Sequence, residues 1–284
     1  MRRFSSLFGV FLDFVLPEGA GGRHGSPAQA DWFTVETVRL ELRRLPKVFS
    51  GIRVAQISDI HMGGWMNKDR LQIVANLLMN EQPDVLLITG DFLIGRGFAE
   101  KTRNWLGDLN TVLTPLASAI PSYAVLGNHD YWTNSRAVRA MLSSSGITDL
   151  TNTVSMLHRQ GRTLYLCGVD DVRAGDVRLD QVSSQLNGED AAILLAHEPD
   201  FADVSAATGK FDLQVSGHTH GGQIVLPIFG APILPQLGKK YPSGLYKVGD
   251  MFQYTNRGLG ANHMALRWNC PPEITIFLLE SVDS

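Results

Sequence analysis

The chain has 284 residues, of which 44% are hydrophobic, so it can bury a sizeable core in one globular domain. Its net charge of −3 is spread along the sequence without a basic block, which argues against nucleic acid as a partner. Cys167 and Cys270 show no C-x-x-C or zinc-finger spacing. We expect free thiols in a reducing compartment, with one disulfide as the alternative.

The first 30 residues form a predicted unit of their own, ahead of a folded domain over residues 31–284. Phe4–Leu16 is apolar and contains Asp13, and it is shorter than the roughly 20 residues that cross a bilayer. As an amphipathic helix it could lie in a membrane interface or dock on the domain, and residues 17–30 would be a flexible tether. Arg2-Arg3-Phe4 also resembles part of an export signal. We expect a cytoplasmic protein, peripheral on the inner membrane, with export left open.

Beyond residue 50, apolar strands alternate with helices, which is typical of the α/β class. Strands are predicted at residues 52–57, 84–89, 122–126, 164–169, 191–195, 211–215, 251–255 and 273–279. Helices are predicted from an Asn67 cap to residue 80, at 102–117 and 134–144, and with a weaker pattern at 178–186. Gln160-Gly161-Arg162 predicts a hairpin turn, and Asp170-Asp171 follows a strand without a motif that indicates a role.

Residues 220–260 are rich in Gly and Pro and predict a long ordered loop. Its apolar content, which includes Ile228, Phe229 and Ile233, fits a lid or a wall for a hydrophobic substrate. A loop that simply covers the edge of the fold is the alternative. Arg257 follows the strand at 251–255 and is a candidate ligand for a substrate phosphate, with a salt bridge as the competing interpretation.

Short polar motifs follow five of the strands. They are Asp59-Ile60-His61, Gly90-Asp91, Gly127-Asn128-His129-Asp130, His197 and Gly217-His218-Thr219-His220. Because strand carboxyl ends in an α/β sheet meet at one edge, these side chains should lie together. Mixed imidazole and carboxylate ligands suit Mn, Fe, Zn or Co, and such a set can hold two ions. One motif alone would be weak, whereas the ordered set predicts a dimetal hydrolase of phosphate esters or anhydrides.

The ordered set resembles the calcineurin-like metallophosphoesterase superfamily. This resemblance implies a four-layer α/β/β/α sandwich of two mixed sheets. It implies that one metal ion is bound by Asp59, His61 and His220, that a second is bound by Asn128, His197 and His218, and that Asp91 bridges both. His129 is the implied catalytic histidine, and Asp130 could orient its imidazole. Two divalent ions, Mn²⁺ first and Fe, Zn or Co otherwise, would hold a bridging hydroxide as the nucleophile.

Three further strings resemble a bacterial, membrane-associated subgroup of this superfamily. They are His220-Gly221-Gly222-Gln223, Arg257-Gly258-Leu259-Gly260 and Asn269-Cys270-Pro271-Pro272. The subgroup includes UDP-2,3-diacylglucosamine pyrophosphatases of lipid A biosynthesis. The expected function is therefore hydrolysis of a phosphodiester or pyrophosphate bond in a phosphate ester or lipid-linked nucleotide.

Two alternatives stay open: a phosphomonoesterase or protein phosphatase with the same metals, and a non-catalytic binding scaffold. Asp130 differs from the G-N-H-E motif of protein serine/threonine phosphatases. The scaffold alternative predicts missing ligands, yet all seven ligand positions and His129 are present.

Overall fold

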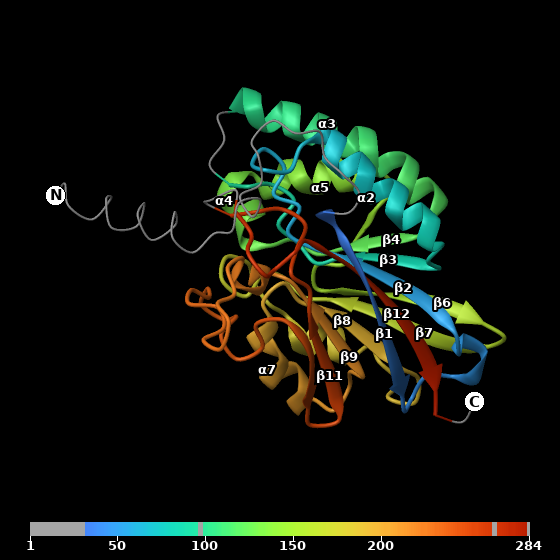
Figure 1. Cartoon of the computed structure of the whole chain (residues 1–284). Helices are drawn as coiled ribbons and strands as arrows, with labels where there is room; N and C mark the ends of the chain where they lie inside the picture. Colours follow the sequence, from blue (N-terminus) through green and yellow to red (C-terminus); the bar gives the residue numbers. More distant parts are fainter. Residues whose placement is uncertain (1–31, 96–98, 263–265, 283–284) are drawn as a thin grey trace.

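The computed structural model describes residues 32–95, 99–262 and 266–282. Two β-sheets are stacked face to face, with helices on their outer faces (Figure 1). This arrangement confirms the predicted four-layer α/β/β/α sandwich. The segment Phe4–Leu16 and the tether that follows it lie outside the described residues.

The first sheet has the strand order β1-β12-β2-β3-β4-β5. Its strands are β1 (Thr34–Leu42), β12 (Glu273–Ser281), β2 (Ile52–Ile57), β3 (Val85–Ile88), β4 (Ser122–Ala124) and β5 (Thr148–Asp149). Strands β2 to β5 run parallel, while β12 is antiparallel to β2 and parallel to β1. The central strands read as continuous apolar runs because both faces of the sheet are covered.

The second sheet has the order β10-β11-β9-β8-β7-β6. Its strands are β10 (Gly244–Val248), β11 (Met251–Thr255), β9 (Leu213–Ser216), β8 (Ala192–Leu195), β7 (Arg162–Gly168) and β6 (Thr153–Arg159). The predicted hairpin joins β6 and β7 through Gln160 and Gly161, whose φ angles of 47° and 75° suit a tight two-residue turn.

The helices cover both outer faces. They are α2 (Lys68–Glu81), α3 (Ala99–Ala119), the short α4 (Asn128–Thr133), α5 (Ser135–Ser144), α6 (Leu179–Ser183) and α7 (Ala202–Ala207), with the 3₁₀ turns η2 (Lys47–Phe49), η3 (Pro199–Phe201) and η4 (His220–Gly222). Helices α2, α3 and α5 pack on the first sheet, and α6 and α7 on the second. As predicted, Asn67 caps α2, where its side chain accepts a hydrogen bond from the Arg70 N–H.

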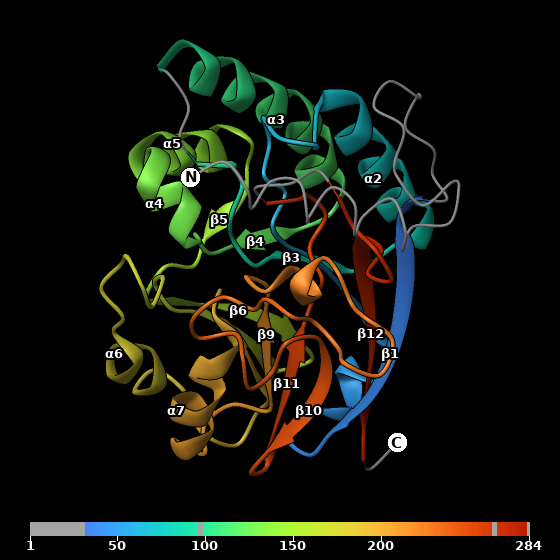
Figure 2. The ribbon, with the colours of Figure 1, turned by 60° about the vertical axis from the view of Figure 1, so that its left-hand side comes forward.

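The core between the sheets fixes their relative position. Side chains from both sheets meet there, among them Val54, Leu87, Leu166, Ile193 and Phe277, all fully buried. Each such side chain contributes roughly 1.5–3 kcal/mol through burial. The two sheets are therefore held so that the carboxyl ends of β2, β3, β4, β8 and β9 reach one shared edge (Figure 2).

The predicted long loop at residues 220–260 is shorter than expected. Residues 244–248 form β10, which pairs with β11 as an antiparallel hairpin. The prediction of a loop was therefore wrong for these five residues. The remaining segment, residues 223–243, is called the apolar loop below. Within the described ranges, every helix falls short of the length or apolarity that a bilayer crossing needs.

Candidate metal centre and catalytic site

The seven predicted ligand residues lie at the edge that the two sheets share. Asp59 and His61 follow β2, Asp91 follows β3 and Asn128 opens α4 directly after β4. From the second sheet, His197 follows β8, while His218 and His220 follow β9. All seven side chains are buried, none being more than 6% exposed. The two sheets thus deliver polar groups from distant parts of the chain to one place.

Asp59, His61 and His220 form one compact group whose ligand atoms all lie within 4.8 Å of one another. The Nε2 atoms of His61 and His220 are 3.0 Å apart. Asp59 Oδ1 lies 3.8 Å from the first of these nitrogens and 3.4 Å from the second. This is the set that the resemblance implies for the first ion.

Asp91 lies between two imidazoles. Its Oδ2 is 3.5 Å from His61 Nε2 and 3.3 Å from His197 Nε2. Asp59, Asp91 and His197 also form a group with ligand atoms within 4.8 Å of one another. A carboxylate in this position can serve ions on both sides.

Asn128 and His218 complete the expected second set. Asn128 Oδ1 is buried and has no hydrogen-bond partner in the described part of the chain, a costly arrangement that a bound cation would relieve. The His218 ring lies 5.0 Å from the His197 ring, measured between centroids, although it belongs to neither compact group. The donor set and the orphaned oxygen fit two divalent ions.

Backbone carbonyls orient three of the imidazoles. His61 Nδ1 is 3.2 Å from the Leu93 carbonyl and His197 Nδ1 is 2.7 Å from that of Thr89. His218 Nε2 is 2.9 Å from the Gln236 carbonyl. Because a carbonyl only accepts, each of these nitrogens carries a proton, and the other ring nitrogen is the one that could bind a metal once it is deprotonated.

Arg267 is a residue that sequence reasoning missed. Its Nη2 lies 3.2 Å from His220 Nδ1 and donates to the Arg257 carbonyl at 2.8 Å. Burial lowers the pKa of His220 well below its usual range, and the charges of His61 and Arg267 add to the lowering. The ring is therefore neutral, and because a guanidinium only donates, Nδ1 accepts and the ring proton is on Nε2, where a metal ion would have to replace it. A single arginine outside any motif carried no signal for this role.

The carboxylates and imidazoles shift each other's pKa values. Burial raises the pKa of Asp59 to about 6 and lowers that of His61 to about 3. Burial would also raise the pKa of Asp91, but the neighbouring imidazoles, His197 first, hold it well below its usual range. Burial alone would lower the pKa of His197, but the charge of Asp91 raises it well above its usual range. A bound cation would take over the charge balance that the His197 proton provides.

Five of the seven candidate ligands have left-handed backbone conformations. The φ angles are 49° at Asp59, 49° at His61, 56° at Asp91, 70° at His218 and 53° at His220. Such conformations cost of order 1–3 kcal/mol each in residues other than glycine and concentrate at functional sites. The surrounding structure holds these residues in positions that serve the site at the expense of local stability.

Gly127 leaves the space that Asp91 occupies. A Cβ atom at this position would lie 2.3 Å from Asp91 Oδ1 and 2.7 Å from His197 Cε1. We expect Gly127→Ala to displace the proposed bridging carboxylate and to lower turnover by about 10²-fold, the effect of a misplacement of about 1 Å. Metal content and turnover should fall together.

Gly107→Ala is the matched control for Gly127→Ala. Gly107 is exposed inside α3, and a Cβ atom there meets nothing within 4 Å. This variant should keep full activity and gain roughly 0.5–1 kcal/mol in the free energy of unfolding. Full metal occupancy in Gly127→Ala would contradict the packing argument.

His129 and Asp130 lie beside the cluster. The His129 ring centroid is 4.7 Å from that of His61, and its Nδ1 is 2.6 Å from the Ile94 carbonyl. Asp130 accepts hydrogen bonds from the Gly127 and Leu93 N–H groups, and no hydrogen bond joins it to the His129 ring in the described residues. The expectation that Asp130 orients the imidazole directly was wrong, because from the first turn of α4 its carboxylate points back to the start of the helix.

Arg257 is engaged by two carboxylates. Its Nε lies 2.6 Å from Glu273 Oε2, and its Nη2 lies 2.8 Å from Glu36 Oε1. The structure thus shows the salt bridge that the sequence left open as the alternative. A contact between Arg257 and a substrate phosphate stays a prediction.

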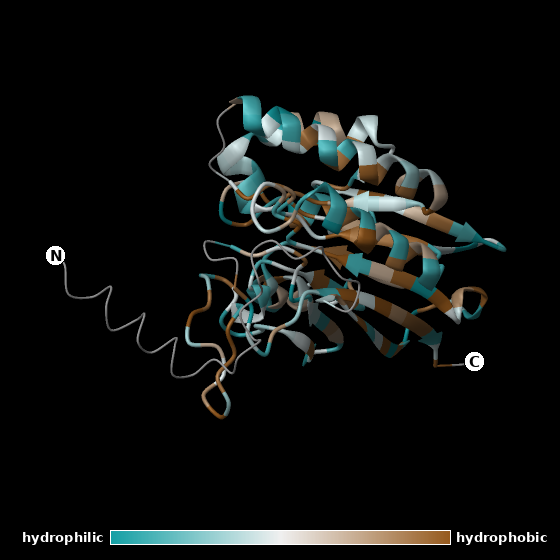
Figure 3. Ribbon diagram, turned by 45° about the horizontal axis from the view of Figure 1, so that its top comes forward, coloured by the Kyte–Doolittle hydropathy of each residue, from teal (hydrophilic) through white to brown (hydrophobic). Residues whose placement is uncertain are grey.

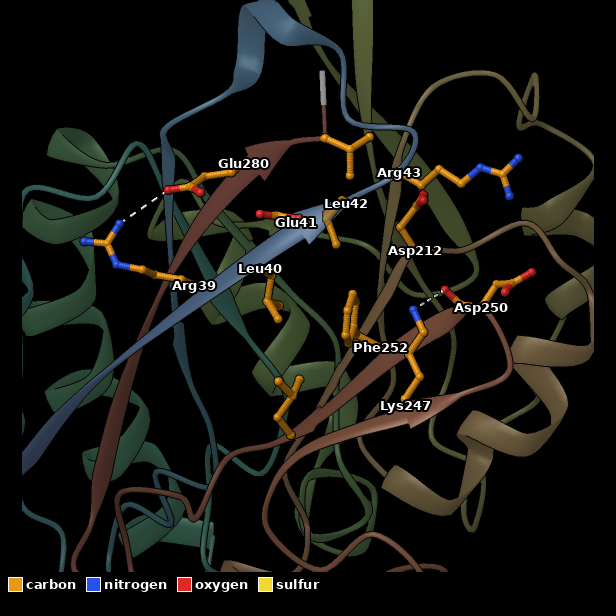
Figure 4. A pocket seen from close by; sticks show the side chains of 12 residues that line it. Arg39, Leu40, Glu41, Leu42, Arg43, Asp212, Lys247, Asp250, Phe252 and Glu280 are labelled. Carbon is orange, nitrogen blue, oxygen red and sulfur yellow. Dashed lines mark hydrogen bonds and ion pairs between the residues drawn. The ribbon is translucent and has the colours of Figure 1, made fainter. Parts of the chain in front are cut away.

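A separate hollow of about 590 Å³ lies at the opposite end of the sheets (Figure 4). Charged and apolar side chains line it, including Arg39, Asp212, Lys247 and Phe252. None of the predicted site residues takes part, so it is not the site described above.

Comparison with known proteins agrees with this geometry. Residues 52–222 match the family model for Calcineurin-like phosphoesterase. The chain is 31% identical to the uncharacterized metallophosphoesterase YkuE of Bacillus subtilis, over 99% of this chain and 98% of that protein. It is 30% identical to phosphodiesterase YaeI of Escherichia coli, over 87% of this chain and 88% of that one.

Two further matches are more distant in length or sequence. A zebrafish protein named transmembrane protein with metallophosphoesterase domain is 32% identical, over 87% of this chain and 57% of its own length. The solved structure of sulfate thiohydrolase SoxB from Thermus thermophilus superposes with a TM-score of 0.51 at 11% identity, covering 83% of this chain and 57% of that one. The latter match shows the fold alone.

The two-sheet sandwich carries a buried carboxylate–imidazole cluster that could hold metal ions. The chain belongs to the calcineurin-like phosphoesterase family. It is a metallophosphoesterase, a hydrolase that acts on phosphoric ester bonds and binds divalent metal.

Proposed function

We propose that this enzyme hydrolyses the phosphodiester or pyrophosphate bond of a lipid-linked nucleotide, with UDP-2,3-diacylglucosamine as the candidate substrate. The observation that carries the proposal is a physical link between the metal cluster and the apolar loop. The Gln236 carbonyl, in that loop, accepts the hydrogen bond from His218 Nε2 at 2.9 Å. The loop that carries the exposed apolar side chains is therefore anchored at the cluster.

The apolar loop exposes large hydrophobic side chains. Ile228 is 100% exposed, Phe229 83% and Ile233 75%, and Figure 3 shows apolar residues along the segment that projects from the molecule. Exposed apolar groups clustered in this way mark interaction sites. Acyl chains of a substrate, still embedded in a bilayer or extracted from it, would cover them.

A peripheral position on a membrane follows from the same proposal. The sequence of Phe4–Leu16 fits an interfacial helix, and the zebrafish relative is named as a transmembrane protein. Both features favour an enzyme that meets its substrate at a lipid surface.

The proposed chemistry assigns a task to each residue. Two divalent ions, with Mn²⁺ as the proposed metal, supply Lewis acidity and a water of lowered pKa as the nucleophile when they are bound. Asp59, His61 and His220 would hold one ion, the Asn128, His197 and His218 side chains the other, and Asp91 both. His129, whose Nδ1–H donates to the Ile94 carbonyl, would in its doubly protonated form give the Nε2 proton to the leaving oxygen as the P–O bond breaks.

A comparison of three substrates tests this function. Protein reconstituted with Mn²⁺ should release UMP from UDP-2,3-diacylglucosamine and should cleave bis(p-nitrophenyl) phosphate faster than p-nitrophenyl phosphate. Diester cleavage without UMP release would discard the lipid-linked substrate and keep the phosphodiesterase. A strong preference for the monoester would instead favour the phosphomonoesterase alternative.

The double substitution Ile228→Ser/Phe229→Ser tests the apolar loop. It should lower kcat/KM for the lipid-linked substrate by about 10- to 100-fold, because each contact between an apolar side chain and an acyl chain stabilises the complex by up to roughly 1.5–3 kcal/mol. Hydrolysis of bis(p-nitrophenyl) phosphate should stay within about twofold of wild type, since small esters need no apolar wall. Met156→Ser, at an exposed apolar residue of the edge strand β6, is the control that should leave both activities unchanged. Equal losses for both substrates would contradict the loop's role.

A further inference from the structure

Trp132 is an exposed aromatic residue beside the proposed catalytic histidine. It lies in α4, and its ring centroid is 4.9 Å from that of His129 with an angle of 47° between the planes. The side chain is 54% exposed. An indole left in water next to the reaction centre is available to contact a ligand or to position a neighbouring group.

Arg173 lies over this indole. Its guanidinium carbon is 5.2 Å from the Trp132 ring centroid. No carboxylate lies within ion-pair distance of Arg173 among the residues that the structure describes, whereas Arg178, on the same segment, pairs with Asp176 at 2.8 Å. Arg173 therefore presents an uncompensated positive charge at the rim of the site.

Buried carboxyl groups hold the segment that carries Arg173. Asp171 Oδ1 accepts the N–H groups of Arg173 at 3.0 Å and of Ala174 at 2.6 Å, and Glu198 Oε2 accepts that of Val172 at 3.0 Å. Both Asp171 and Glu198 are fully buried, and Glu198 directly follows His197. Asp170 holds the same segment farther along, because its Oδ2 accepts the Asp176 N–H at 2.9 Å, so both members of the acidic pair after the strand at 164–169 have a structural role. The segment is fixed before any ligand binds, so Arg173 would lose little conformational freedom on binding.

Trp132 connects Arg173 to the site. Its ring lies between the guanidinium, 5.2 Å from the ring centroid, and the His129 ring, 4.9 Å away between centroids. In Figure 2, the chain that leads into α6 passes close to α4, as the contact between Arg173 and Trp132 requires.

We propose that Arg173, positioned by Trp132, binds a second phosphate of the substrate, next to the phosphoryl group that is attacked. A guanidinium without a carboxylate partner forms paired hydrogen bonds to a phosphate, which makes this subsite specific for diphosphates over simple phosphate diesters. The inference rests on the proposed function, because it assumes that the attacked phosphoryl group lies at the cluster. It selects the pyrophosphate bond from the two bond types proposed above.

Calorimetric titration of Mn²⁺-loaded protein with UMP and with the uncleavable α,β-methylene analogue of UDP, called UDP below, tests the subsite without turnover. Arg173→Gln should weaken UDP binding by about 10- to 100-fold, the value of a charge-assisted contact, and should change UMP binding much less. Trp132→Leu should weaken UDP binding by about two- to fivefold, because the guanidinium loses its support. Arg178→Gln, the matched control on the same segment, should bind UDP as wild type does.

UDP binding that is absent from wild type or unchanged in Arg173→Gln would overturn the subsite. Equal weakening of UDP binding and UMP binding in Arg173→Gln would also overturn the subsite, since the loss would then not involve the second phosphate. Metal content, measured for each variant, separates a lost phosphate contact from a lost ion. If UDP binding depends on Arg173 while UDP-2,3-diacylglucosamine is not cleaved, the subsite is supported and the proposed lipid substrate is wrong.

Discussion

Replacing Asp91 by alanine should leave the protein without either metal ion and should lower phosphodiester hydrolysis by about 10³-fold or more. Asp91 Oδ2 lies 3.5 Å from His61 Nε2 and 3.3 Å from His197 Nε2, so one carboxylate is placed to serve both proposed ions. Its loss also removes the charge that compensates His197, which leaves a set of mainly neutral ligands. Metal analysis after reconstitution with Mn²⁺, together with turnover of bis(p-nitrophenyl) phosphate, measures both effects.

Asp69→Ala is the control for this variant. Asp69 is exposed in the first turn of α2, outside the cluster, and its loss should change neither metal content nor turnover. Circular dichroism of Asp91→Ala should show a folded protein, because the cores on either side of the sheets do not include this residue. A variant that keeps one full equivalent of metal would show that Asp91 belongs to one ion only.

The order of the polar motifs predicted the cluster because each motif directly follows an apolar strand. Asp59, Asp91 and Asn128 come from the first sheet and His197 from the second, and the strands before them are plain in the sequence. Parallel strands place their carboxyl ends at one edge, so local pattern and topology point to the same place. The fold class and the clustering of candidate ligands could therefore be inferred without coordinates.

Interactions made through the backbone or through isolated side chains could not be inferred. The groups that orient His61, His129 and His197 are main-chain carbonyls. Every residue type has such a carbonyl, so the sequence does not indicate which ones are used. Asp130 was expected to hold His129, yet its carboxylate caps the start of α4. Arg173 lies on a short segment between β7 and α6, and only the fold brings it over Trp132.

His129→Ala should keep both ions and slow diester hydrolysis by about 10²- to 10⁴-fold. The Ile94 carbonyl occupies Nδ1, so Nε2 is free for proton transfer to the leaving oxygen. His158→Ala, at an exposed histidine of β6, is the control and should behave as wild type. His129 also forms a group with His61 and Asp91 whose ligand atoms lie within 4.8 Å of one another. Metal loss in His129→Ala would therefore make it a ligand instead of a proton donor.

The leaving group provides a second, independent readout for His129. p-Nitrophenolate and a sugar phosphate are weakly basic and depart without needing a proton, whereas an alkoxide gains much more from protonation as the P–O bond breaks. The defect of His129→Ala should therefore be smallest for p-nitrophenyl esters and should grow as the pKa of the leaving group rises. A defect of the same size for every leaving group would mean that His129 stabilises charge on the phosphoryl oxygens, because that contribution does not depend on which group departs.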